Sequence, residues 1–140
     1  MIITEPATAR RRVPMTSLRR TALIAGVVYL ITFISIPTLA LYAPVRDDPT
    51  YILGPGPDTP ALIGAALEIV VALACIGTAV VLYPVVKRQN EALAMGFVGA
   101  RVLEAATIFA GVASLLSVVT LRQAGAGAEA LVAGQALVAL

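Results

Sequence analysis

The chain has 140 residues, of which 59% are hydrophobic and 13% charged, with a formal net charge of +2 and a mean hydropathy of +0.94. Soluble domains average roughly 45–50% apolar and ~25% charged residues, so the composition excludes an ordinary soluble fold. The small net charge argues against nucleic acid as a partner. Histidine is absent and Cys75 is the one cysteine, so we expect no catalytic site, metal, cofactor or intramolecular disulfide.

Residues 1–20 are polar and basic, with arginines at Arg10, Arg11, Arg12, Arg19 and Arg20. A basic head before an apolar run is also typical of a signal peptide. The run that follows is longer than a signal-peptide core, however, and no small-residue cleavage site comes after it. We therefore interpret 1–20 as a basic cytoplasmic tail.

Three apolar runs follow, at about residues 21–42, 60–86 and 92–120. Each is long enough to cross a hydrocarbon core of ~30 Å, which needs about 20 residues. The sequence therefore predicts an all-α polytopic membrane protein whose transmembrane domain covers 21–123. Within the first run, Pro37 predicts that the helix kinks or ends near Ser35, and Tyr42 is expected at the water interface as an aromatic anchor.

Residues 43–59 are rich in proline, glycine and aspartate, which predicts a loop without regular structure and with a solvated acidic surface. The spacing of the three aspartates matches no calcium loop. Asp58, before Thr59 and Pro60, is expected to cap the second helix.

The distribution of basic residues predicts the orientation. The N-terminal tail has five arginines and the hinge at 87–91 has Lys87 and Arg88, whereas the 43–59 loop has only Arg46. Because positive charge stays on the cytoplasmic side, we expect the N-terminus and the hinge inside a cell membrane and the loop outside. The second and third runs then form a helical hairpin.

Residues 124–140 contain Glu129, Gln135 and three glycines among apolar residues. This stretch is short for a span and weakly amphipathic. It predicts a short C-terminal helix at the interface or an incomplete fourth span.

Three ionisable residues lie inside the apolar runs: Glu68, Arg101 and Glu104. Arg101 and Glu104 are three residues apart, which suits an ion pair on one helix. In an antiparallel hairpin Glu104 comes within about 7 Å in height of Glu68, and Arg101 within about 12 Å. An ionised group facing hydrocarbon costs about 3 kcal/mol, so we expect neighbouring helices to shelter all three.

Small residues accompany both glutamates at helical spacing. One stripe, around Glu68, consists of Gly64, Ala72, Cys75 and Ala79; the other, around Glu104, consists of Gly96, Ala100, Thr107, Gly111 and Ser114. Small side chains let helix backbones approach closely. We expect the two stripes to match and to serve as helix-packing surfaces.

Two interpretations of the charged residues remain open. In the first, they tie helices together in a non-enzymatic membrane component that assembles with another copy or a membrane partner. In the second, the chain is a half-length carrier or channel in which Glu68 and Glu104 form a proton or ion relay. The sequence favours the first, because it contains no second polar cluster, no aqueous path and no polar pocket for an enzyme.

Several strings resemble a known family. They are YILGPGPDT, the hinge LYPVVKRQNEALA, ARVLEA and SLLSVVTLRQ, and the likeness covers about Arg19 to Gln123. The chain resembles bacterial membrane proteins known as domain of unknown function four-three-eight-six. The resemblance implies an integral protein of the bacterial cytoplasmic membrane and brings no activity with it. Similar proteins continue into further spans, so it also implies that this chain is a truncated or half-length form that needs a partner.

Overall fold

The computed structural model describes residues 16–139, which form five α-helices and three short 3₁₀ turns without any strand. The helices are α1 (Ser17–Ile31), α2 (Ser35–Arg46), α3 (Thr59–Val86), α4 (Glu91–Gln123) and α5 (Leu131–Val138). The turns are Thr32–Ile34, Tyr51–Leu53 and Ala128–Ala130. This confirms the predicted all-α class. Of the expected tail, the described residues include only the end, and Ser17 to Arg20 already belong to α1.

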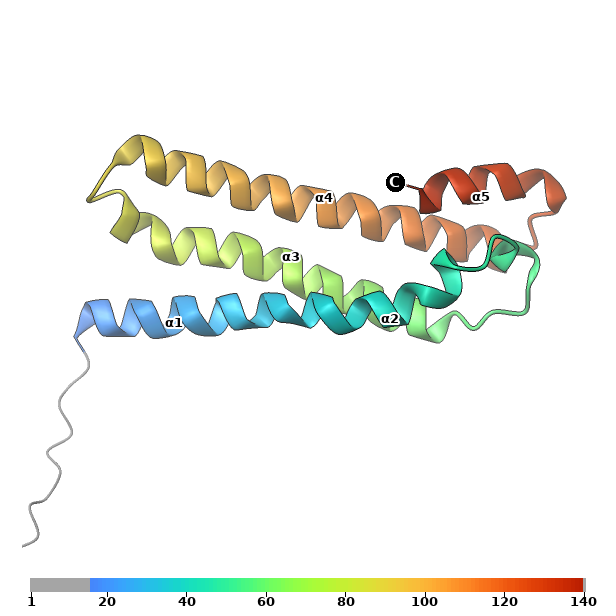
Figure 1. The fold of residues 1–140 in the computed structure, drawn as a ribbon, viewed down its shortest axis with the longest axis horizontal. Helices are drawn as coiled ribbons and strands as arrows, with labels where there is room; N and C mark the ends of the chain where they lie inside the picture. Colours follow the sequence, from blue (N-terminus) through green and yellow to red (C-terminus); the bar gives the residue numbers. More distant parts are fainter. Residues whose placement is uncertain (1–15, 140) are drawn as a thin grey trace, which may run out of the picture.

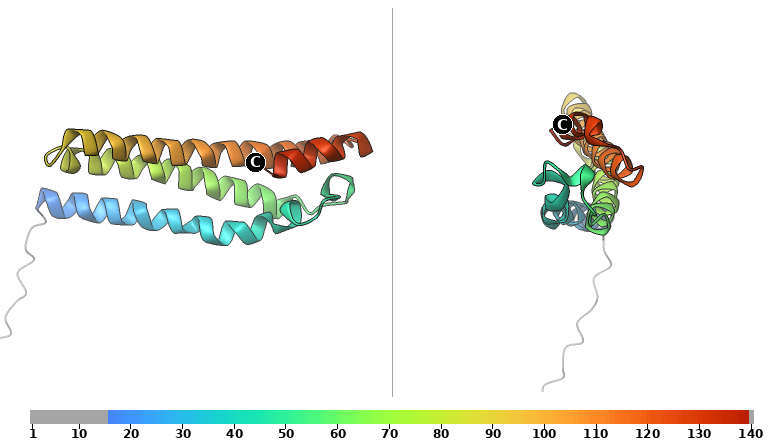
Figure 2. Two further views of the ribbon diagram at one scale, coloured as in Figure 1. Left: turned by 45° about the horizontal axis from the view of Figure 1, so that its top comes forward. Right: turned by 90° about the vertical axis from the view of Figure 1, so that its right-hand side faces the viewer.

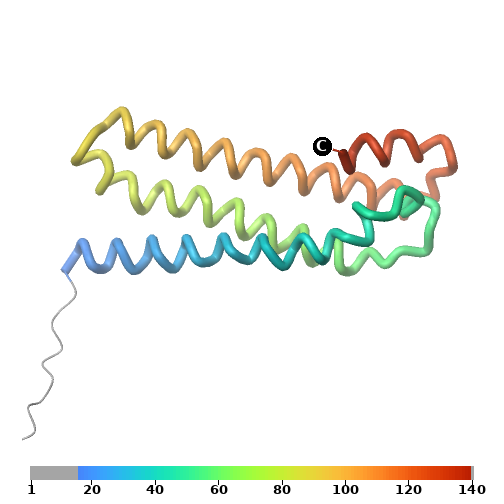
Figure 3. Tube along the Cα trace, viewed as in Figure 1, coloured from blue at the N-terminus to red at the C-terminus, as the bar shows by residue number. Residues whose placement is uncertain are grey.

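Three long helical rods lie side by side, with α3 in the centre (Figure 1). The first rod is α1 with α2, and both it and α4 pack against α3. The start of α1 lies at the same end as the hinge between α3 and α4, and we call this the hinge end (Figure 3). The opposite end, where the chain passes from α2 to α3 and where α5 lies, is the loop end. Seen along the rods, α5 folds back against the end of α4 (Figure 2).

The first rod changes from α to 3₁₀ geometry at Thr32–Ile34, one turn before Pro37. A proline inside a helix lacks its N–H and its ring clashes with the carbonyl four residues earlier, here Phe33. The irregularity therefore lies where Pro37 predicts it. The helix nevertheless continues to Arg46, so the prediction of a loop from residue 43 is wrong. The last turn is held by Val45, which is buried against Val118 and Val119 of α4.

The hinge is short and well capped. Helix α3 ends at Val86, and α4 begins at Glu91, where the side chain of Asn90 accepts a hydrogen bond of 3.0 Å from the Leu93 N–H. With 28 and 33 residues, α3 and α4 are about 42 and 50 Å long, so both exceed a hydrocarbon core of ~30 Å.

Apart from Glu68, Arg101 and Glu104, the charged side chains of the described residues gather at the two ends. Arg19, Arg20, Lys87, Arg88 and Glu91 lie at the hinge end, and Arg46, Asp47, Asp48, Asp58, Arg122 and Glu129 at the loop end. The middle carries exposed large apolar side chains such as Leu30, Leu73 and Leu103. Three helical stretches are long and apolar enough to cross a membrane, namely Ser17–Arg46, Thr59–Val86 and Glu91–Gln123. The protein is therefore a multi-pass membrane protein.

The C-terminal segment forms α5, which has eight residues and so is about 12 Å long, too short to span a bilayer. It packs on the turn Tyr51–Leu53, because a Cβ placed on Gly134 would collide with Ile52. Tyr51 and Ile52 form an apolar core at the loop end with Val45, Val118 and Val119, and Leu137 and Val138 of α5 pack against it.

Candidate functional site

Glu68 lies on the face of α3 that meets α2. Its side chain is almost buried, since the residue is 7% exposed. The Ser35 hydroxyl donates to Glu68 Oε1 over 2.9 Å, and the Thr38 hydroxyl is hydrogen-bonded to the same oxygen. Both hydroxyls come from the first turn of α2, directly after the 3₁₀ turn. The irregular geometry thus ends where two polar side chains are presented to Glu68.

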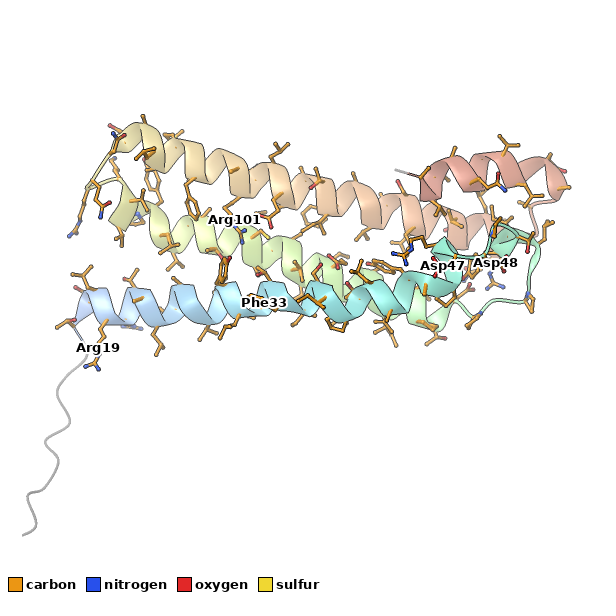
Figure 4. The ribbon with its side chains drawn as sticks, in the orientation of Figure 1. Arg19, Phe33, Asp47, Asp48 and Arg101 are labelled. Carbon is orange, nitrogen blue, oxygen red and sulfur yellow. The ribbon has the colours of Figure 1, made fainter. Side chains whose placement is uncertain are left out.

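Arg101 and Glu104 form an ion pair on α4, with 2.5 Å between Nη1 and Oε2. The Arg101 side chain is only 13% exposed, and its guanidinium lies 5.9 Å from the ring centroid of Tyr29 on α1, within cation–π range. Figure 4 shows Arg101 directed from α4 toward α1. Its Nε and Nη2 are buried without a hydrogen-bond partner among the described residues.

The structure keeps the expected Arg101–Glu104 pair and leaves Glu68 apart from it. Within residues 16–139, no hydrogen bond or ion pair joins Glu68 to Arg101 or Glu104. The expected shelter holds for Glu68 and Arg101 but is wrong for Glu104, whose side chain is 46% exposed. The reason is rotational: Ala105 is the buried residue that faces α3, and Glu104 lies about 100° away around the helix.

The small-residue stripe of α3 lies entirely within the packed interior, since Gly64, Glu68, Ala72, Cys75 and Ala79 are all buried. A Cβ on Gly64 would come within 2.5 Å of Tyr42 Cε1. Tyr42 therefore packs into the space that this glycine leaves, and its hydroxyl is buried without a hydrogen-bond partner within residues 16–139. Tyr42 thus packs against α3, and its expected role as an anchor at the water interface stays a prediction.

The stripe of α4 is not matched to that of α3. Its residues Gly96, Ala100, Thr107 and Gly111 are exposed, and only Ser114 is half-buried. A Cβ added to Gly96 or Gly111 would have nothing within 4 Å. The expectation that the two stripes pack on each other is therefore wrong, and the α4 stripe is left free on the surface of the chain.

A further polar group, missed by the sequence analysis, closes the loop end. The Asp58 carboxylate is paired with the Arg122 guanidinium, accepts from the Tyr51 hydroxyl over 2.6 Å, and accepts from Gln123 Nε2 over 2.9 Å. We call these four residues the Asp58 cluster. The guanidinium also donates to the Gly54 carbonyl over 3.3 Å and lies 5.5 Å from the Tyr51 ring centroid. The cluster ties the loop to the end of α4.

The Asp58 cluster changes the pKa values of two of its members, Asp58 and Tyr51, which lie outside the membrane-spanning helices. Burial acts to raise the pKa of Asp58, but hydrogen bonds from Tyr51, Gln123 and Arg122 together with the Arg122 charge outweigh it and lower the pKa to about 2. Burial, and then the hydrogen bond to Asp58, raises the pKa of Tyr51 to about 12. Asp58 is thus ionised and Tyr51 neutral across the physiological range.

Asp58 occupies the expected capping position, but its side chain makes no capping hydrogen bond. The expectations of a capping side chain and of a solvated carboxylate are both wrong for this residue, because its oxygens are used by the cluster. One signal was present in the sequence: Arg122, the single arginine after Thr120, and Asp58, directly before α3, lie at the same end of an antiparallel hairpin. Gly56 also fits, since its φ is +103° and a Cβ there would lie 3.1 Å from Arg122 Nη1.

Within the described residues, no group of three or more histidine, cysteine, aspartate or glutamate side chains could hold a metal ion. A family model described as "Domain of unknown function (DUF4386)" matches residues 24–140. This is the family that the sequence strings resemble, and the match extends beyond Gln123 through α5. No curated protein and no solved structure matches the chain.

Proposed function

Since the chain belongs to the DUF4386 family, whose function is unknown, we propose from its geometry that it is a non-enzymatic component of the bacterial cytoplasmic membrane. It assembles with a second copy of itself through the exposed stripe of α4, which we call the α4 face: Gly96, Ala100, Glu104, Thr107 and Gly111. The α3 stripe is not available for assembly, because the chain's own helices cover it.

The observation that supports assembly is the exposure of Glu104. It lies thirteen residues into α4 from Glu91, about 20 Å along the helix, and so at the depth of the hydrocarbon core. A carboxylate facing lipid there costs about 3 kcal/mol. Small neighbours on both sides let another backbone approach closely enough to cover it. The same face carries the Thr107 hydroxyl, which donates to the Glu104 carbonyl over 2.8 Å in the single chain and can turn to the Glu104 carboxylate of a second copy.

Cysteine cross-linking tests this interface. In a Cys75→Ala background, Ala100→Cys should form a disulfide-linked dimer in oxidised membranes. The matched control is Val102→Cys, which is 48% exposed and lies about 200° around α4 from residue 100. It should give little cross-linked product. Equal cross-linking at both positions, or none at residue 100, would contradict a dimer through the α4 face.

A second candidate, a proton or ion carrier, is favoured by the surroundings of Glu68. A nearly buried carboxyl with two hydroxyl partners, placed at a helix irregularity inside a span, is chemistry suited to proton binding. A direct step between Glu68 and Glu104 has no support, because no contact joins them within the described chain.

Proton flux separates the two candidates. The wild type, Glu68→Gln and Glu104→Gln are each reconstituted in liposomes with a pH-sensitive dye. Flux that disappears only in Glu68→Gln would support a carrier. Negligible flux in all three proteins would remove that candidate and leave the structural one.

A further inference from the structure

Two adjoining cavities lie between α2, α4 and α5 at the loop end. The outer cavity has a volume of about 310 Å³ and the inner cavity about 170 Å³. They share Val45, Arg46 and Val138 in their walls. The outer one alone reaches the roughly 300–1,000 Å³ that is usual for small-molecule sites.

The polarity of these cavities changes along the membrane normal. Arg46, Asp48 and Gln135 line the outer cavity. Asp48 lies at the loop end, beside Asp47 (Figure 4). Besides Arg46, the inner cavity is lined by Tyr42, one turn deeper on α2, by Ser114 and Gly111 of α4, and by apolar side chains such as Leu115 and Leu137. Polar groups therefore lie at headgroup depth and apolar groups at acyl-chain depth, which is the polarity of a phospholipid.

The polar end presents both signs of charge. The Arg46 guanidinium is half-exposed and pairs with Asp47 through Nε over 3.0 Å. The Asp48 carboxylate accepts from the Thr50 N–H over 2.8 Å and from its hydroxyl over 2.7 Å. These hydrogen bonds lower the pKa of Asp48 below its ordinary value, so it stays ionised. A cation and an anion on one rim are complementary to a zwitterion.

We propose that the two cavities bind one phospholipid whose headgroup carries a phosphate and a primary ammonium. The phosphate lies at Arg46, the ammonium at Asp48, and an acyl chain enters the inner cavity. The Tyr42 hydroxyl, which is buried and has no hydrogen-bond partner in the described part of the chain, is a donor for an ester carbonyl at that depth. An anionic headgroup would bring another negative charge beside Asp47 and Asp48, and a choline headgroup has no N–H to donate. The inference does not depend on assembly through α4.

Native mass spectrometry of the full chain tests the lipid preference. The protein is released from vesicles containing equal amounts of phosphatidylethanolamine, phosphatidylcholine and phosphatidylglycerol. We expect one retained phosphatidylethanolamine, favoured by about tenfold over the other two, because charge-assisted hydrogen bonds account for the difference. Asp48→Asn should reduce that preference by about tenfold, whereas Arg46→Gln removes the phosphate partner common to all three lipids and should lower the retention of each by about tenfold.

The matched controls are Arg88→Gln and Glu91→Gln, which change the same charges at the hinge end and line neither cavity. They should leave the preference unchanged. Arg46 and Asp48 are exposed, so their substitution removes no core contact, and unchanged helical circular dichroism confirms folding. Equal retention of all three lipids, or an equal effect of the hinge-end variants, would overturn the proposal.

Discussion

At the scale of single residues, the charged side chains of this protein divide between those that hold the chain together and those left exposed. Asp58 is the clearest case of the first kind, because it is held by Tyr51, Arg122 and Gln123 at once. Removing one member of a buried pair leaves the others without partners. The substitution Asp58→Asn therefore probes how strongly the loop is fixed to α4.

We expect Asp58→Asn to lower the free energy of unfolding by about 2 kcal/mol at pH 7, the loss typical of a hydrogen bond to a charged group. The pKa of Asp58 is about 2 in the folded protein, below the ~3.9 of an unfolded chain. Its contribution is therefore complete above about pH 4 and is lost as the pH falls toward 2. Thermal unfolding in detergent at pH 7 and pH 2 should show the gap between wild type and variant closing.

Asp47→Asn serves as the control, because its carboxylate is 62% exposed and its one ion pair among the described residues is with the neighbouring Arg46. It should change the unfolding temperature little at either pH. A gap between wild type and Asp58→Asn that is as large at pH 2 as at pH 7 would mean that the carboxylate charge is not what holds the loop.

The ionisable residues within the spans were visible in the sequence, because charges stand out in apolar runs. The Arg101–Glu104 pair followed from their spacing on one helix. The partners of Glu68 did not, because Ser35 and Thr38 come from another helix and meet Glu68 only after the 3₁₀ turn changes their direction. The exposure of Glu104 depends on how α4 is rotated against α3, which the spacing of small residues does not determine.

At the scale of helices, the two small-residue stripes have different surroundings and so respond differently to the same substitution. Gly64→Ala places a methyl group 2.5 Å from Tyr42, so the contact between α2 and α3 must open. Overpacking of this kind costs typically 1–3 kcal/mol, and we expect about 2 kcal/mol here. Gly96→Ala meets nothing within 4 Å and gains up to about 1 kcal/mol of helix propensity.

Thermal unfolding of the two glycine variants in detergent, at protein concentrations that keep the chain monomeric, measures this contrast. Gly64→Ala should unfold at a lower temperature than the wild type, and Gly96→Ala at the same or a higher one. The reverse order would show that α4, and not α3, supplies the central packed surface.

The helices themselves could be predicted from hydropathy, since each long apolar run became a helix. The end of α2 could not. Proline and glycine content argued for a loop from residue 43, but burial of Val45 against α4 keeps the chain helical to Arg46 despite Pro44. At the end of α2, packing against α4 thus outweighs the local preference of the sequence for a loop.

At the scale of the whole molecule, charge is distributed unequally between the two ends of the rods. In the described residues, the hinge end has four basic side chains and one acidic, while the loop end has two basic and four acidic. Lysine and arginine near span ends favour the cytoplasmic side. We therefore expect the hinge end inside the cell and the loop end, with the lipid cavities, in the outer leaflet.

Labelling of single cysteines in intact cells tests this orientation. In a Cys75→Ala background, Asp47→Cys at the loop end should react with a membrane-impermeant maleimide added outside. Gln89→Cys in the hinge should react only after the membrane is opened. Both positions are exposed, so a difference in labelling reports the side of the membrane and not burial. Labelling of residue 89 alone in intact cells would show that the protein has the opposite orientation. The cavities at Arg46 and Asp48 would then take their lipid from the cytoplasmic leaflet.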